Sequence, residues 1–200
     1  MRIGIDFDNT IACYDGVFHT AAFQRGLIPA DLGASKNEVR DYLNNSGRSE
    51  DFTELQGYVY GARMDLVAPY VGFGAFLAQA TGSKNELFIV SHKTKNPMLG
   101  PKYDMHTAAR GFLEAQGFIG NNGVQPKNIY FEQTKEDKVA RANKLAVDVF
   151  IDDLPEILSM RGFPAGLRPI LFDPDGRYPD DKAFERHTAW SAIATALFGG

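Results

Sequence analysis

The stretch IDFDNT, Ile5 to Thr10, decides how the beginning of this chain is interpreted. Strand residues are mostly β-branched or apolar, and Asp and Asn are depleted from strands. A strand is expected over Arg2 to Phe7, so polar side chains replace core residues where this strand finishes. We therefore expect the polar end of IDFDNT to belong to a site rather than to the core.

Length and composition limit what this site can be. The 200 residues, with 44% hydrophobic content, can form one domain or one domain with a smaller insertion. A net charge of -4 and a pI near 5.6 provide no general attraction to nucleic acid or to an anionic membrane, so the expected partner is a small molecule. The sequence does not indicate an oligomeric state.

The expected location is cytoplasmic. The single cysteine, Cys13, excludes an internal disulfide and fits a reducing compartment. No apolar run approaches the ~20 residues that span a bilayer. The N-terminus enters a strand without the apolar region of a signal peptide. These features predict a soluble protein.

Apolar strands alternate with helical stretches along the chain, which is typical of an α/β fold with a Rossmann-like parallel sheet. The predicted strands are Arg2 to Phe7, Glu86 to Ser91, Lys127 to Glu132, Val147 to Ile151 and Arg168 to Phe172. The predicted helices are Val71 to Ala80, Tyr103 to Gly117, Thr134 to Ala146 and a last helix within His187 to Gly200. Thr134 is a candidate N-cap, and Gly117 is expected to close its helix.

The interval after the first strand is too long for a single crossover and predicts an inserted helical domain. We assign residues 1–13 and 67–200 to the main domain and residues 14–66 to the insertion. Three helical segments are expected in the insertion, at 16–28, 35–47 and 50–65. Ser35 and Glu38 have the spacing of a capping box at the start of the second.

Alternation along the first strand places Asp6 and Asp8 on the same side. Ligands of open parallel sheets bind beyond the carboxyl ends of the strands. Two other predicted strands also end in polar residues, one in Ser91 and the other in Asp152 and Asp153. The sequence therefore predicts a polar site at one edge of the sheet.

Carboxylates gathered at this edge would require a counter-charge, because each pair at about 4 Å repels by roughly 4 kcal/mol at an effective dielectric constant near 20. A site of oxygen ligands favours a hard cation, and Mg²⁺ is the usual one where carboxylates and a phosphate share the coordination. Thr10 and Ser91 can donate hydrogen bonds, and Lys135 or Lys138 can neutralise phosphoryl oxygens. The pattern thus predicts a phosphate site built around a metal.

Four segments, in this order, resemble the motifs of the haloacid dehalogenase (HAD) superfamily, whose members are mostly Mg²⁺-dependent phosphatases. They are DFDNT at Asp6 to Thr10, the strand ending in Ser91, a lysine in the helix before the fourth predicted strand, and FIDD at Phe150 to Asp153. The insertion stands where that superfamily has its type 1 helical cap. Each motif falls at a predicted strand end or helix start.

The resemblance implies a role for each of these residues. Asp6 would be the nucleophile that forms an aspartyl-phosphate, and Asp8 the general acid and base. Mg²⁺ would be bound by the side chains of Asp6 and Asp152 and the carbonyl of Asp8, with Asp153 as a further ligand or support. The phosphoryl group would be held by Thr10, Ser91, the amide of Asn9, and Lys138 or Lys135.

The sequence itself adds an argument on the role of Asp8 and on the choice between Lys138 and Lys135. Asp8 argues against the carbon-halogen branch of the superfamily, since a halide leaves without protonation and those enzymes lack this second aspartate. Lys138 is favoured over Lys135 because it continues an apolar stripe through Ala142 and Leu145.

The substrate expected is a small phosphorylated metabolite, such as a sugar phosphate, because a cap would obstruct a folded partner. The basic segment after Ser91 could bind a second anionic group or could be a solvated loop; it carries His92, Lys93, Lys95, Lys102 and His106. Tyr14, Arg48 and Arg63 are candidate contacts in the insertion. A 5'-nucleotidase, a phosphosugar mutase and a non-catalytic domain that binds a phosphorylated ligand remain the alternatives.

Overall fold

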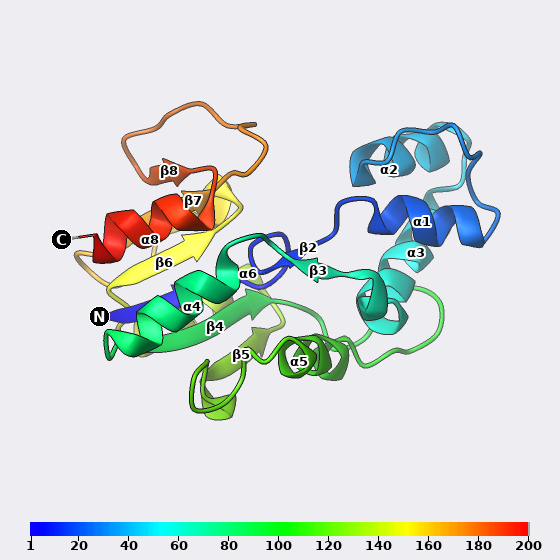
Figure 1. Cartoon of the computed structure of the whole chain (residues 1–200). Coiled ribbons are helices and arrows are strands. Elements are labelled where there is room, and N and C mark those ends of the chain that lie inside the picture. The colour runs from blue at the N-terminus through cyan, green and yellow to red at the C-terminus, as the bar shows by residue number, and fades with distance from the viewer. Residues whose placement is uncertain (200) are drawn as a thin grey trace. The chain divides into compact units, whose positions relative to one another are not determined.

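Six strands form one parallel sheet in the computed structural model of the chain, which describes residues 1–199 (Figure 1). Their order is β5-β4-β1-β6-β7-β8, so the first strand lies in the interior of the sheet. The strands are β1 (Arg2–Ile5), β4 (Glu86–His92), β5 (Ile129–Glu132), β6 (Val149–Asp152), β7 (Arg168–Phe172) and β8 (Glu185–His187). The predicted α/β fold with a Rossmann-like parallel sheet is confirmed.

The remaining elements are the helices and a second, two-stranded sheet made of β2 (Ala12–Cys13) and β3 (Ala68–Pro69). The α-helices are α1 (Val17–Gln24), α2 (Lys36–Asn45), α3 (Ser49–Ala62), α4 (Phe73–Gly82), α5 (Met105–Ala115), α6 (Lys135–Lys144), α7 (Pro155–Leu158) and α8 (Trp190–Phe198). Two 3-10 turns are η1 (Met64–Leu66) and η2 (Pro126–Asn128).

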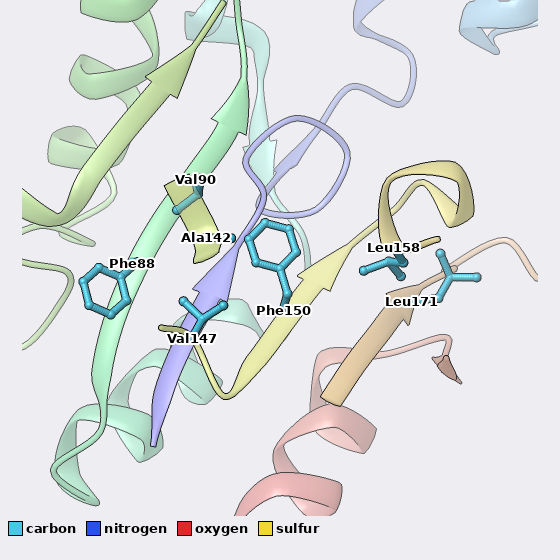
Figure 2. Close-up of a cluster of buried hydrophobic side chains, with 7 residues drawn as sticks. All are labelled: Phe88, Val90, Ala142, Val147, Phe150, Leu158 and Leu171. Atoms are coloured by element: carbon cyan, nitrogen blue, oxygen red, sulfur yellow. The ribbon is translucent and has the colours of Figure 1, made fainter. Parts of the chain in front are cut away.

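One face of the six-stranded sheet packs against α6. Figure 2 shows the cluster on this face, with ring and aliphatic side chains from β4, β6 and β7 beside those from α6, the loop after it and α7. Its buried members are Phe88, Val90, Ala142, Val147, Phe150, Leu158 and Leu171. A Cβ at Gly4 would lie 2.5 Å from the Phe150 ring, so only glycine lets β1 and β6 pack this closely. The α6 face is therefore densely filled up to the level of the strand ends.

The other face is covered by α4 and α8, which lie side by side in Figure 1. The Trp190 ring of α8 is fully buried, 4.9 Å from Phe73, 4.7 Å from Phe76 and 5.3 Å from Phe172 between ring centroids. The last predicted helix is thus present, and its aromatic side chain anchors it to both α4 and the sheet.

Local sequence signals mark several helix starts and one helix end as predicted. Ser35 and Glu38 form a complete capping box at the start of α2. Thr134 caps α6, since its hydroxyl accepts a hydrogen bond of 3.0 Å from the amide of Asp137. Gly117 has φ of 71° just beyond α5, the left-handed conformation that glycine permits.

Some boundaries differ from the sequence prediction. β1 ends at Ile5 rather than Phe7, although the Asp6 amide still donates to the Ile151 carbonyl at 2.9 Å. β8 and α7 were not predicted, because β8 has the polar sequence Glu-Arg-His and α7 has four residues. Neither carries an apolar pattern long enough to be recognised.

The chain divides into two compact units. Unit 1 contains Met1–Ala12, Pro69–Lys93 and Glu114–Gly200, and unit 2 contains Cys13–Ala68 and Thr94–Leu113. Residues 94–113 lie within the predicted main domain, 67–200, but in the structure they group with the inserted residues in unit 2. Gly57 in α3 lies so close to Pro97 that a Cβ there would be 2.5 Å from the proline ring.

Within unit 2, aromatic rings form much of the interior. Phe18 of α1 lies 5.7 Å from Tyr60 and 6.1 Å from Phe52, and Tyr14 lies 5.0 Å from Tyr60, between ring centroids.

Across residues 1–199, no helix combines the length and apolar character needed to cross a membrane.

Candidate active site

A tight turn follows β1 and contains the polar end of IDFDNT. The amides of Ile11 and Ala12 both donate to the Phe7 carbonyl at 3.0 Å, and Asn9 has a left-handed φ of 56°. Asn tolerates this conformation better than most residues. The Trp190 indole donates to the Thr10 carbonyl at 3.1 Å, so α8 is hydrogen-bonded to this turn.

Lys138 is the charged centre of the site. Its Nζ lies 2.6 Å from Oδ1 of Asp6 and 2.6 Å from Oδ2 of Asp152. All three side chains are almost inaccessible to solvent. Burial lowers the pKa of Lys138, but the carboxylates of Asp152 and Asp6 outweigh burial and raise that pKa above its ordinary value. Lys138 is therefore a permanent cation between two strand ends.

Asp153, which is half-buried, completes a cluster of three carboxylates with Asp6 and Asp152. One oxygen from each lies within 4.8 Å of the others. Burial raises the pKa of Asp152 to about 6, with Lys138 acting against the shift and Asp6 adding to it. Burial, Asp6 and Asp152 raise the pKa of Asp153 well above its usual range. The cluster is short of positive charge, despite the lysine.

This donor set fits the predicted metal. Three carboxylate oxygens that converge from two neighbouring strand ends are hard ligands, as Mg²⁺ requires, and no thiol or imidazole is among them. Burial first, and the neighbouring carboxylates second, raise the pKa of Asp152 and Asp153, as expected for acids gathered away from water. Asp6, Asp152 and Asp153 are therefore the residues that could hold a divalent cation.

Asp8 does not join this cluster through its side chain but pairs with a second lysine. Both its carboxylate oxygens accept from Nζ of Lys93 at 2.9 Å. Lys93 directly follows β4, and its side chain is only 3% exposed, whereas that of Asp8 is 20% exposed. The two aspartates of IDFDNT thus form ion pairs with different lysines, Asp6 with Lys138 and Asp8 with Lys93.

Two of the predicted phosphate contacts, Thr10 and Ser91, are buried side chains near the strand ends. Thr10 is fully buried, and its hydroxyl is 3.5 Å from Oδ2 of Asp6. Ser91 is buried near the end of β4, and within residues 1–199 its Oγ has no hydrogen-bond partner. The Asn9 amide instead donates to the Ala12 carbonyl at 2.9 Å, so this predicted contact is engaged inside the turn.

Lys135, the alternative lysine, lies at the surface. It forms an ion pair with Glu156, and its side chain is 40% exposed. Lys138, three residues further along α6, is instead buried together with Val139 and Ala142. The structure thus brings Lys138, and not Lys135, to Asp6.

The less specific candidates are distributed over both units. In unit 1, the His92 ring nitrogen lies 3.1 Å from the Gln133 carbonyl. In unit 2, Lys95 pairs with Asp104 at 3.7 Å, and Lys102 is exposed. Arg48 bonds to Asp51 and the Leu27 carbonyl, Arg63 bonds to Asp65 and Gln24, Tyr14 is buried among aromatic rings, and His106 is half-buried.

Two contributors to the site were not identified from the sequence. Lys93 was assigned to a basic loop, yet its position two residues after Ser91 at the end of a strand is a signal that could have been used. Trp190, which holds the Thr10 carbonyl, is 180 residues away in the chain, and no local pattern connects the two.

Several solved structures with a similar fold are HAD-superfamily hydrolases. A HAD family hydrolase from Deinococcus radiodurans R1 with bound phosphate and sodium is 17% identical, with 98% of this chain and 94% of that chain covered and a TM-score of 0.59. A predicted phosphatase from Clostridium acetobutylicum is 13% identical, with coverage of 100% and 98% and a TM-score of 0.59. This chain has the fold of the HAD-superfamily hydrolases.

The HAD fold alone does not decide the chemistry. A dehalogenase structure is also similar, at 12% identity, with 100% of this chain and 97% of that chain covered and a TM-score of 0.57. No family model and no curated protein matches the sequence. The side chains gathered at the strand ends must therefore indicate the reaction.

Proposed function

We propose that this chain is a Mg²⁺-dependent phosphatase of the HAD superfamily that hydrolyses a phosphomonoester of a small metabolite, such as a sugar phosphate. The observation that carries the proposal is the contact of Lys138 with both Asp6 and Asp152, beside Asp153. It combines a fixed carboxylate, a permanent cation and a set of oxygen ligands in one place. Phosphoryl transfer requires this combination of positioning and charge stabilisation.

Asp6 is the nucleophile in this proposal. Its Oδ attacks phosphorus, the bond from phosphorus to the ester oxygen breaks, and the electron pair of that bond stays on the leaving oxygen. Asp8 gives its proton to that oxygen and becomes a carboxylate. A water molecule then attacks the aspartyl-phosphate, Asp8 takes a proton from the water, and phosphate leaves as the Asp6 carboxylate is regenerated.

The remaining residues bind and orient the phosphoryl group. The buried hydroxyls of Thr10 and Ser91 would donate hydrogen bonds to its oxygens, and Lys138 would neutralise part of its charge. Asp6, Asp152 and Asp153, with the carbonyl of Asp8, would hold Mg²⁺, which supplies further positive charge against the phosphoryl oxygens when bound. We leave the Asn9 amide out of this set because it donates within the turn.

Asp8 favours a phosphatase over a dehalogenase. A halide leaves as a stable anion, whereas an alkoxide leaving group requires a proton. A general acid such as Asp8 is therefore useful for cleavage of a phosphate ester but not of a carbon-halogen bond. Asp8 is 20% exposed, so it is accessible from solvent. We further propose that the inserted residues 14–66 act as a cap that selects a small substrate, in a protein of the cytoplasm.

The test is phosphate release from a panel of phosphorylated metabolites, measured for the wild type, with and without a chelator, and for Asp6→Asn. We expect activity on at least one ester, and loss of at least about 10³-fold in Asp6→Asn because the covalent route is removed. Asp175→Asn, an exposed acid paired with Arg177, is the matched control and should leave the rate unchanged.

An Asp6→Asn variant with the wild-type rate would exclude the aspartyl-phosphate mechanism. Full activity in the chelator would exclude the metal. Transfer of the phosphoryl group to a second sugar instead of to water would identify a mutase, and a preference for nucleoside monophosphates would identify a nucleotidase.

A further inference from the structure

A buried ion pair between Lys93 and Asp8 stands apart from the three carboxylates around Lys138. The Lys93 ammonium contacts both Asp8 oxygens at 2.9 Å and lies 5.4 Å from the centre of the Phe7 ring. The backbone amide of Lys93 donates to the Glu132 carbonyl at 2.8 Å, which fixes the end of β4 against β5. The lysine is therefore held at both its backbone and its side chain.

We propose that Lys93 is a positioning residue for Asp8 that orients the carboxyl group for proton transfer to the leaving oxygen. The inference rests on the phosphatase function proposed above. Neither the four motifs nor the general resemblance assigns a role to this lysine. The evidence is geometric: one cation contacts both oxygens of the acid and is itself out of reach of solvent.

The exposures of the two side chains show which one can meet a substrate. Lys93 is 3% exposed and Asp8 is 20% exposed, so the ammonium lies behind the carboxylate as seen from solvent. A carboxylate oxygen has two lone pairs, so an oxygen of Asp8 that accepts from Lys93 has the capacity for a second hydrogen bond. The ion pair therefore leaves Asp8 able to hydrogen-bond to a leaving group or to water.

The pair also fits the charge change at Asp8 during the reaction. When Asp8 is protonated, one oxygen carries the proton toward the leaving oxygen and the other can still accept from Lys93. As the proton moves, negative charge develops on the carboxyl group, and both oxygens can then accept from the ammonium. Lys93 thus keeps the same contact through the step and stabilises the carboxylate that proton donation produces.

A direct contact of Lys93 with the phosphoryl group is the competing explanation. The Lys93 side chain is only 3% exposed, so little of it is accessible to a bound phosphoryl group. Lys138 already provides a cation within 2.6 Å of the proposed nucleophile. Two lysines with two different carboxylate partners therefore indicate two roles, one for Asp6 and one for Asp8.

The experiment measures kcat/KM with two esters for the wild type and Lys93→Met. An alkyl phosphate has a leaving group that requires a proton, whereas 4-nitrophenyl phosphate releases a stable anion that does not. Since kcat/KM covers only the steps up to departure of the alcohol, later hydrolysis of the aspartyl-phosphate does not enter the comparison. Lys127→Met, an exposed lysine in η2, is the matched control.

We expect Lys93→Met to lower kcat/KM for the alkyl ester by about 10- to 100-fold, part of the roughly 10²- to 10⁴-fold that a general acid contributes, and for the nitrophenyl ester by less than about threefold. In an Asp8→Asn background, the same substitution should change the alkyl-ester value by less than about threefold, because the two residues act as a unit. Lys93→Gln, which keeps a donor without the charge, is the second variant if Lys93→Met does not fold.

An equal loss for both esters would overturn the inference and assign Lys93 to phosphate binding instead. A loss that persists at full size in the Asp8→Asn background would also overturn it. A wild type that cleaves neither these esters nor any metabolite in the panel would refute the proposed function, and this inference with it. The two failures are therefore distinguishable.

Discussion

Replacement of Lys138 by methionine is the sharpest test of the site as a charged unit. Methionine keeps the length of the side chain and removes the ammonium, so the substitution leaves Asp6 and Asp152 buried without their shared cation. Both ion pairs are 2.6 Å long, and the three side chains are between 0% and 6% exposed. Removal of one partner from a buried pair typically destabilises a protein by about 3–5 kcal/mol.

The loss should be visible in thermal and chemical unfolding. For a chain of this size, about 2–4 °C per kcal/mol translates the expected loss into a decrease in Tm of roughly 6 to 20 °C. The single tryptophan, Trp190, is buried in unit 1, so its fluorescence reports unfolding of the unit that contains the site. Measurements in urea with a chelator present give the free energy of unfolding without a contribution from metal.

Lys135→Met provides the control within the same helix. Lys135 pairs with Glu156 at the surface, and an exposed pair of this kind contributes only about 0–1 kcal/mol. We therefore expect Lys138→Met to be destabilised by at least 2 kcal/mol more than Lys135→Met. Equal effects, or a larger effect at Lys135, would refute the assignment of the buried cation to Lys138.

Two further predictions concern the parts of the site that support Asp6. Addition of Mg²⁺ at about 100 times its Kd should stabilise the chelated protein by about 2.7 kcal/mol, and Asp153→Asn should reduce the increase in Tm; a wild-type Tm that ignores Mg²⁺ would contradict the metal site. Trp190→Phe leaves the buried Thr10 carbonyl without its indole donor and should lower the free energy of unfolding by about 1–3 kcal/mol. Urea unfolding followed by circular dichroism measures the second effect, and an unchanged stability would show that the turn does not depend on α8.

The sequence predicted the parts of the fold and site that depend on local pattern. Alternation and the change from apolar to polar residues located the ends of β4 and β6 to within one residue and the end of β1 to within two, because these features follow from the geometry of a strand covered on both faces. Capping chemistry located the starts of α2 and α6. The stripe through Ala142 and Leu145 was also sufficient to favour Lys138, which the structure buries with Ala142, since burial follows helix periodicity.

Features that depend on distant contacts could not be predicted in the same way. The pair of Lys93 and Asp8 joins residues 85 positions apart, and a lysine in a basic segment is usually solvated. The grouping of 94–113 with unit 2 depends on close contacts such as Gly61 against Tyr103, where a Cβ would lie 2.2 Å from the tyrosine side chain. β8 is held by its pairing with β7 and not by any pattern of its own.

The charges at the strand ends indicate how substrate and cation depend on each other. When all three acids are ionised, Asp6, Asp152 and Asp153 carry three negative charges. Lys138 neutralises one of them, so the cluster keeps two negative charges. A phosphoryl group would add about 1.5 to 2 negative charges at pH 7. Since like charges at about 4 Å repel by roughly 4 kcal/mol at an effective dielectric constant near 20, the metal-free cluster should repel the phosphoryl group of the proposed substrate. Binding of a divalent cation and binding of the phosphoryl group must therefore favour each other to the same extent, as linkage requires.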